Sequence, residues 1–350
     1  MDKKIKTMKK LVYITLVAFA MLTVMVSCHK ENIPMPDVGG EDAGLTPASA
    51  AKFQEIRARA LENLKQTETF RAEDGIFFIS ENGARVYIQP RSLRDENDNI
   101  VTGDVTLSFI ELYDRGSMVV TNKPLMGQDP GNGGALVPLV TGGQYQLEVT
   151  QADRLLKPAN TFDVSIPTSL TGGKDDDMSL WKGEFDEDGN LSWAGAESDV
   201  AEFQPPMMID STGVDEEDPR SYNIWQRTFR WINIDRFWHD SRPKTPVSVS
   251  VPMGYSDQNA AVYLAFETEP NVLMSLVEFN EAGNYFSPFN GELPIGLTIH
   301  VIFVSESDGE VVHAIKTTTI AEDTAITIGS SELQTGTTVE QLVDLVNALD

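Results

Sequence analysis

The residues best suited to binding chemistry gather between positions 225 and 239. Tryptophans stand there with amide, carboxyl, guanidinium and imidazole side chains between them. Sugars and peptides bind where an aromatic face meets flanking hydrogen-bonding groups, so this segment holds the candidate ligand-binding residues: Trp225, Trp231, Asn233, Asp235, Arg236, Trp238 and His239. The favoured alternative is a core-bound edge loop in which Asp235 and Arg236 satisfy backbone groups, because β-sheet proteins need buried tryptophans.

A second pattern has the spacing of a calcium-binding loop. Asp186, Asp188, Asn190 and Glu197 occupy its first, third, fifth and twelfth positions, and oxygen ligands are the ones that calcium prefers. Leu191 stands where such a loop needs glycine, and we expect a strand rather than a helix to follow. An ordinary Asp-Gly hairpin turn explains the same residues. Calcium is therefore a candidate ligand, and no other cofactor is expected.

Catalytic motifs are absent from the sequence. His239 has no nucleophile near it in sequence and no metal-ligand spacing such as His-Glu-x-x-His. A two-residue turn at Asp308-Gly309 would set His300 and His313 about 13 Å apart on paired strands, which is too far to share a metal. We therefore expect a protein that is not an enzyme, and we name no catalytic residue.

The only cysteine, Cys28, indicates where the protein is located. Lys9 and Lys10 precede a mostly apolar stretch at 11–26, a pattern typical of a secretory signal and too short for a comfortable membrane span. The residues Val24-Met25-Val26-Ser27-Cys28 resemble the lipobox of bacterial lipoproteins, in which the cysteine is diacylated and becomes the mature N-terminus. The resemblance implies loss of the signal peptide 1–27 and a membrane anchor on Cys28. Cleavage by an ordinary signal peptidase, with Cys28 unmodified, is the alternative.

Composition limits the other partners. The net charge is −26, from 53 acidic and 27 basic residues, whereas nucleic acids and anionic lipid surfaces both attract a basic face. We therefore expect no nucleic-acid partner. A hydrophobic content of 41% is enough for sizeable cores, and a length of 350 residues suits two domains.

Helices are predicted near both ends of the folded part. Residues 28–45 are rich in proline and glycine, which predicts a flexible tether. Residues 46–69 contain an amphipathic helix with Thr46 as N-cap and Pro47 in the first turn. Thr338 and Gln341 have the spacing of a capping box, so we expect a C-terminal helix whose apolar stripe docks on a sheet.

Between these helices the sequence alternates as β-strands do. Residues 70–168 carry short β-branched or aromatic runs separated by turns, which predicts an antiparallel β-sandwich. Residues 169–221 form an acidic linker with one hairpin, in which Trp193 lies opposite Gly183. Residues 222–350 form a second β domain. The predicted fold class is mostly β: two antiparallel β-sandwich domains with an N-terminal amphipathic helix and a C-terminal docking helix.

Turn and core residues of the first β domain carry a family resemblance. They are Gly83-x-x-Val86-x-Ile88-x-Pro90, Leu93-x-Asp95, Val101-x-Gly103-x-Val105, Asn122-Lys123-Pro124 and Gly142-Gly143-x-Tyr145. Over residues 70–160 they resemble the N-terminal immunoglobulin-like β-sandwich of a group of Bacteroidetes surface lipoproteins of unknown function. His29-Lys30-Glu31-Asn32 resembles part of the export tag that follows the lipidated cysteine in such proteins. The resemblance implies a fold and an outer-membrane or cell-surface location, and it implies no activity.

Two functions of different classes follow from these observations. The one we favour is a lipid-anchored, non-catalytic surface lipoprotein that binds or scaffolds a surface glycan or protein. The alternative is a hydrolase of surface glycan or peptide whose carboxylates are brought together by the fold. A cleft with two buried carboxylates would favour the enzyme, and a shallow aromatic strip would favour the binding protein.

Overall fold

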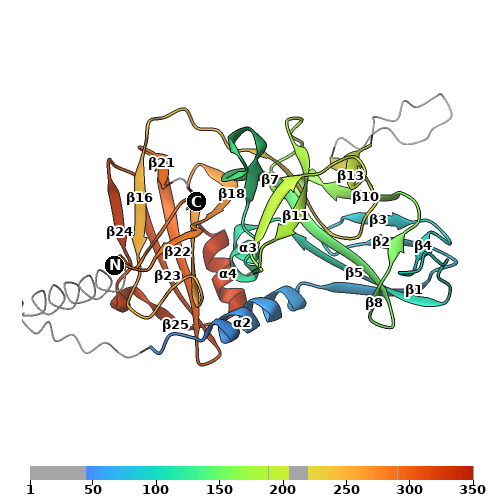
Figure 1. Cartoon of the computed structure of the whole chain (residues 1–350), viewed down its shortest axis with the longest axis horizontal. Helices are drawn as coiled ribbons and strands as arrows, with labels where there is room; N and C mark the ends of the chain where they lie inside the picture. Colours follow the sequence, from blue (N-terminus) through green and yellow to red (C-terminus); the bar gives the residue numbers. More distant parts are fainter. Residues whose placement is uncertain (1–44, 188, 205–219, 290, 350) are drawn as a thin grey trace, which may run out of the picture. The chain divides into compact units, whose positions relative to one another are not determined.

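The computed structural model describes residues 45–187, 189–204, 220–289 and 291–349, and within them the chain is mostly β-strand (Figure 1). These residues belong to one compact unit. The predicted signal peptide, Cys28, the tether as far as residue 44 and the candidate calcium ligand Asp188 lie outside the described residues.

The largest sheet contains eight strands, and part of it closes on itself. Its order is β1-β5-β7-β15-β11-β12-β6, with β8 beside β7, and β6 also pairs with β7. The length of β7 allows this closure, because its first residues pair with β6, its middle with β15 and its end with β5. The bounds are β1 (Gln66–Arg71), β5 (Asp104–Leu112), β6 (Met126–Asp129), β7 (Ala135–Gln151), β8 (Arg154–Leu155), β11 (Ser179–Phe185), β12 (Leu191–Gly195) and β15 (Trp231–Phe237).

Glycines make room for large side chains where this sheet closes. A Cβ on Gly183 would lie 2.7 Å from the Cβ of Trp231, and one on Gly127 would lie 2.6 Å from Leu139. Trp193 lies opposite Gly183, so the predicted register of the hairpin is confirmed. The rings of Trp193 and Trp231 meet edge to face at 6.4 Å and are buried together.

A second sheet shares a hydrophobic core with the first. Its order is β13-β14-β10-β3-β2. The ring of Phe78 on β2 lies 5.7 Å from that of Phe109 on β5, across the two sheets, and the ring of Tyr145 on β7 lies 5.8 Å from Phe109 within the first sheet. The bounds are β2 (Ile76–Ile79), β3 (Arg85–Ile88), β10 (Phe162–Pro167), β13 (Ala201–Phe203) and β14 (Ser221–Gln226), and a separate short pair consists of β4 (Leu93–Arg94) and β9 (Lys157–Pro158).

Two further sheets, built from the C-terminal residues, share another core. One has the order β19-β20-β16-β21, with β24 parallel to β16, and the other has the order β18-β17-β22-β23-β25. Val249 and Phe286 of the first meet Val262 and Phe303 of the second in one hydrophobic cluster. The bounds are β16 (Lys244–Ser250), β17 (Ala260–Phe266), β18 (Glu269–Ser275), β19 (Glu278–Asn280), β20 (Tyr285–Ser287), β21 (Glu292–Pro294), β22 (Thr298–Ser307), β23 (Glu310–Thr319), β24 (Thr324–Thr327) and β25 (Gln334–Thr337).

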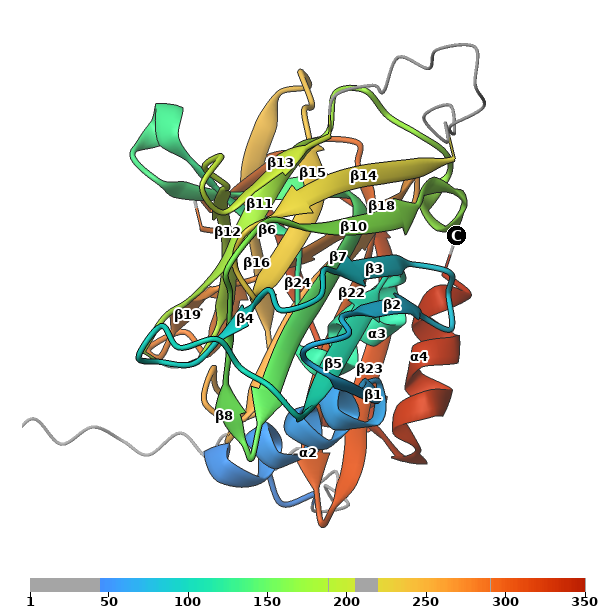
Figure 2. The same ribbon diagram turned by 90° about the vertical axis from the view of Figure 1, so that its right-hand side faces the viewer.

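Helices connect the two sets of sheets. A third hydrophobic cluster contains residues of α2, α3 and α4 together with Trp231 of β15 and Ile302 of β22. Helix α3 lies against α4 (Figure 2), so closely that a Cβ on Gly116 would come 2.4 Å from the carbonyl oxygen of Val343. The bounds are α2 (Ala50–Asn63), α3 (Arg115–Thr121) and α4 (Val339–Asn347), with short 3-10 turns η1 (Pro130–Asn132), η2 (Thr168–Thr171) and η3 (Ser330–Glu332).

The N-terminal helix is shorter than the predicted span 46–69. Its N-cap is Ser49, whose hydroxyl accepts the N–H of Lys52 at 3.3 Å, and Thr46 lies outside it. The last residues of the predicted span, from Gln66 on, belong to β1 instead, because its threonines and phenylalanine pair with β5. At the other terminus, the predicted capping box of Thr338 and Gln341 is confirmed, and α4 packs on α3.

Strand pairing also differs from the predicted division at residues 169–221 and 222–350. β11 and β12 belong to the largest sheet rather than to a linker, and β13 pairs with β14. β14 and β15, predicted to begin the second β domain, pair with β10 and β7 of the first. Alternation along the sequence identifies a strand but does not identify its partner.

Candidate functional site

The first two predicted tryptophans are structural and lie in different sheets. β15 is a central strand between β7 and β11 rather than an edge loop, and Trp231 at its start is buried. Trp225 lies half-buried on β14, where its indole hydrogen-bonds to the carboxylate of Asp163. These two side chains therefore stabilise separate sheets.

Asn233 and Asp235 form a buried polar pair in the middle of β15. The Nδ2 of Asn233 donates to the Oδ2 of Asp235 at 2.5 Å, and the hydroxyl of Thr141 donates to the Oδ1 of Asn233 at 3.0 Å. Burial raises the pKa of Asp235 well above its ordinary value, and within the described residues its Oδ1 has no hydrogen-bond partner. The pairing with β7 shifts register between these two residues. The pair therefore orders the strand rather than facing a ligand.

Arg236 bridges β15 to the loop before β11. Its Nε donates to the Oδ2 of Asp175 at 2.7 Å, and this hydrogen bond lowers the pKa of Asp175. The two side chains are about one-third exposed. Arg236 thus satisfies an acidic loop side chain, and its Nη1 also donates to the backbone carbonyl of Phe237 at 3.5 Å, so the predicted backbone role is confirmed in part.

Trp238 and His239, by contrast, line a pocket of about 540 Å³, which we call the Trp238 pocket. The ring of Trp238 rests on that of Phe266 at 4.7 Å, and its backbone N–H donates to Pro138. His239 is exposed and its ring lies 6.3 Å from that of Phe237. The remaining wall includes Asp129, Asn132, Asp240, Lys244, Phe289 and Glu292.

The chemistry of the Trp238 pocket is that of an aromatic surface with charged groups around it. Asp240 accepts hydrogen bonds from the Nε, the Nη2 and the backbone N–H of Arg242, which lowers the pKa of the Asp240 carboxyl and keeps it ionised. Phe289 is exposed, with an accessible fraction of 40%. Aromatic faces beside ionised and amide groups suit a ligand with both apolar and hydrogen-bonding surfaces.

Most of this wall was not foreseen from the sequence. In the sequence Asp129 is typical only of a turn, and in the structure its carboxylate accepts a hydrogen bond from the N–H of Gly131 at 2.8 Å. Phe289 lies between β20 and β21, and Glu292 is the first residue of β21, far along the chain from Trp238. No local pattern connects these residues, because the fold alone brings them together.

The described candidates for calcium binding have protein partners. Asp186 accepts hydrogen bonds from the backbone and side chain of Asn190 at 2.8 and 3.0 Å. Glu197 accepts a hydrogen bond from the Nζ of Lys182 at 2.9 Å across the hairpin. Over the described ranges, no three His, Cys, Asp or Glu side chains are placed to hold a metal ion. Calcium binding stays a prediction, since Asp188 is outside these ranges.

The histidines of β22 and β23 are separated as predicted. His300 pairs with Thr317 and His313 with Val304 along the same ladder. The ring of His300 contacts the hydroxyl of Thr317 at 2.8 Å, and burial lowers the pKa of His313. These two imidazoles are therefore parts of the sheet and do not form a shared site.

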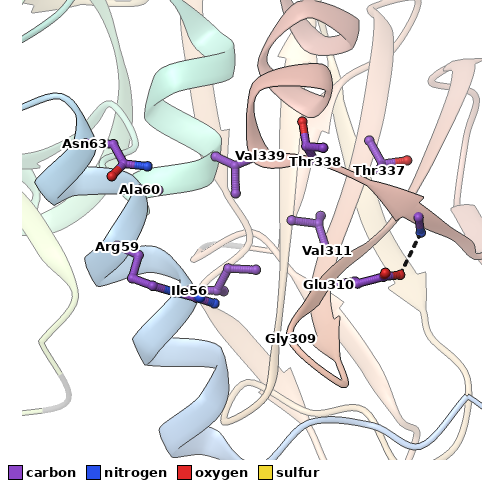
Figure 3. Close-up of a pocket in the computed structure, with 11 residues that line it drawn as sticks. Ile56, Arg59, Ala60, Asn63, Gly309, Glu310, Val311, Thr337, Thr338 and Val339 are labelled. Atoms are coloured by element: carbon purple, nitrogen blue, oxygen red, sulfur yellow. Dashed lines mark hydrogen bonds between the residues drawn. The ribbon is translucent and has the colours of Figure 1, made fainter.

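A smaller pocket of about 340 Å³, the Arg59 pocket, lies beside α2 (Figure 3). Arg59 and Ile56 of α2 face Glu310 and Val311 of β23 across it, with the start of α4 nearby. Glu310 accepts the N–H of Gly336 at 3.2 Å. This pocket lies next to a hairpin turn and a helix cap, and its anionic group already has a protein partner.

Comparison with known proteins adds no further constraint. A scan against protein-family models gives no match, and a search of curated proteins gives none. Among the described residues, no helix has the length and apolar character needed to cross a membrane. Function must therefore be argued from the pockets themselves.

Proposed function

We propose that this chain is a lipid-anchored, non-catalytic lipoprotein of the outer membrane or cell surface, and that it binds a surface glycan or protein through the Trp238 pocket. Two antiparallel β-sandwich modules would present that pocket, held to the membrane by acylated Cys28. The observation that carries the proposal is the meeting of Trp238, His239 and Phe289 at one pocket with polar side chains around them.

The position of the buried carboxyl groups supports binding over hydrolysis. Glu111, Asp235 and Glu306 are buried, and none of these three lines the Trp238 pocket. Glu111 accepts hydrogen bonds from Ser80 and Tyr113, at 2.9 and 3.0 Å. A glycosidase needs a carboxylic acid with a raised pKa beside the scissile bond, whereas the pKa of Asp240 is lowered.

Binding is tested by screening residues 29–350 against glycan and protein arrays and then comparing variants on the ligand found. His239→Ala and Phe289→Ala remove exposed side chains of the pocket, so each should weaken binding by about tenfold while the fold persists. Phe77→Ala is the control, because Phe77 is an exposed aromatic residue of β2 that does not line the Trp238 pocket. Equal binding by both pocket variants and the parent would refute the site.

The anchor is tested separately by fractionation of cells that produce the full chain. The parent should partition with membranes, and a Cys28→Ala variant should be released because no acyl chain can be attached. Membrane partition that is the same for both proteins would refute the anchor and leave the pocket untested by that result.

Hydrolysis remains the second candidate because Asp129, Asp240 and Glu292 all line the Trp238 pocket. Incubation with the array ligand, followed by mass analysis of the products, tests it. Cleavage that is lost in Asp129→Asn or Glu292→Gln would establish the enzyme, and an intact ligand after prolonged incubation would support the binding protein.

A further inference from the structure

A third pocket, the Arg57 pocket, has a volume of about 550 Å³. It is bordered by α2, by the turn between β11 and β12 and by the residues before β17. Leu136 lines both this pocket and the Trp238 pocket, but their polar groups differ. The polar groups considered below are Arg57, Gln54, Ser192, Gln258, Asp186 and Asp257.

Arg57 is a buried cation with no acidic partner among the described residues. The residue is only 8% exposed, and the central carbon of its guanidinium lies 3.8 Å from the ring centre of Phe53. A guanidinium has five N–H donors, whereas the structure gives Arg57 one hydrogen bond, from Nη2 to the hydroxyl of Tyr263 at 3.4 Å. Burial is the main cause of its lowered pKa. Partners for the remaining donors can come from the pocket.

A second buried cation lies near Arg57. Lys123 is 7% exposed, and its ammonium donates to the carbonyl of Thr121 at 3.3 Å. Burial and then the charge of Arg57 lower the pKa of Lys123 to about 8. No carboxylate among the described residues pairs with either cation, although the chain has 53 acidic residues. Uncompensated buried charges cost stability and favour an incoming anion.

We infer that the Arg57 pocket binds the carboxylate of a small acid that also carries several hydroxyl groups, such as a uronic acid. The guanidinium fork matches a planar carboxylate. Ala50 and Ala51, in the first turn of α2, line the same pocket, where the helix macrodipole is positive. Gln54, Ser192 and Gln258 supply amide and hydroxyl groups for the hydroxyls of the ligand.

The acidic side chains of the pocket select for low ligand charge. Asp186 and Asp257 are exposed and line the wall, so they repel an anionic ligand more strongly the more negative charge it carries. A carboxylate carries one negative charge, whereas inorganic phosphate carries more at neutral pH. The pocket should therefore prefer a carboxylate to phosphate, although Arg57 suits both.

Calorimetric titration of residues 29–350 with D-glucuronate tests this inference, with D-glucose and inorganic phosphate as comparison ligands. Glucuronate should bind at least about tenfold more tightly than either, and Arg57→Gln should weaken its binding by at least about tenfold. Arg59→Gln is the matched control. It removes the same kind of side chain from the same helix, but Arg59 lines the Arg59 pocket rather than the Arg57 pocket (Figure 3). The affinity of Arg59→Gln for glucuronate should stay within about twofold of that of the parent, as expected for an exposed charge.

Circular dichroism of Arg57→Gln tests whether the fold persists. A second variant, Gln54→Glu, adds a negative charge to the pocket from an exposed position, so it should also weaken the binding of glucuronate. Equal affinity for glucose or for phosphate, an undiminished affinity of Arg57→Gln, or no glucuronate binding by the parent would each overturn the inference. His239→Ala should leave glucuronate binding unchanged, so either pocket can fail its test without the other.

Discussion

Replacement of Lys123 by methionine should make the protein more stable at neutral pH, even though it deletes a charged group and a hydrogen bond. Methionine has a similar length and no charge, so it removes the cost of burying an ammonium beside Arg57. A pKa lowered from 10.5 to about 8 corresponds to roughly 3 kcal/mol at pH 7. Subtracting about 1 kcal/mol for the hydrogen bond to Thr121, and about 1 kcal/mol for the contacts of the ammonium with the rings of Phe185 and Trp231 at 5.5 and 5.8 Å, leaves a gain of about 1 kcal/mol.

The pH dependence of this gain follows from the direction of the shift. The folded pKa of Lys123 lies below its unfolded value, so the unfolded chain binds more protons between pH 8 and 10.5. The stability of the parent therefore rises with pH in that window, whereas the methionine variant lacks this contribution. The difference between the two proteins should be largest at pH 7 and small near pH 10.

Urea unfolding followed by tryptophan fluorescence, at pH 7 and at pH 9.5, measures the difference. Lys52→Met is the control, because Lys52 is exposed on α2 and its removal should leave the unfolding free energy unchanged at both values. The measurements need buffers without carboxylates, since a bound carboxylate would offset the cost. A Lys123→Met variant that is less stable than the parent at pH 7, or a difference that does not change with pH, would refute the reasoning.

Other predictions concern packing, titration, capping and calcium. Gly116→Ala should lower the unfolding free energy by about 1–3 kcal/mol, because its Cβ would overlap the carbonyl of Val343; unchanged urea midpoints would contradict this. Asp235→Asn should remove a loss of stability that the parent shows in thermal melts as pH rises above about 4, since the folded pKa of Asp235 is raised; parallel pH profiles would exclude it. Thr338→Ala should cost about 1 kcal/mol and speed hydrogen exchange in α4, and unaltered exchange would argue against a stabilising cap. Calcium should raise the melting temperature only if Asp186 and Glu197 share an ion, and melting that is unchanged between calcium and chelator would retire the site.

Local pattern predicted those parts of the fold that depend on neighbours in sequence. The turn at 186–190 and the alternation around it were enough to place Trp193 opposite Gly183. The turn at Asp308-Gly309 likewise set the pairing of β22 with β23. Hairpin register follows from turn length and side-chain alternation, so it can be read from a short segment.

The candidate site was only partly foreseen, for a related reason. Trp238 and His239 were selected by residue type, but Asn233 and Asp235 of the same cluster lie on a central strand and are buried. Residue type indicates what a side chain can do, whereas exposure depends on the strands that flank it. The insertion of β15 between β7 and β11 decided which members of the cluster reach a pocket.

The sequence by itself determined the acidic charge, the signal-like segment before Cys28, the mostly β character and the local hairpins. Only the tertiary structure decided that Arg57 and Lys123 are buried near each other with no acidic partner in the described part of the chain, and that Trp238, His239 and Phe289 meet at one pocket. Contacts of this kind join residues far apart in the chain, and their energies depend on burial and on neighbouring charge, neither of which is encoded in any short stretch of sequence.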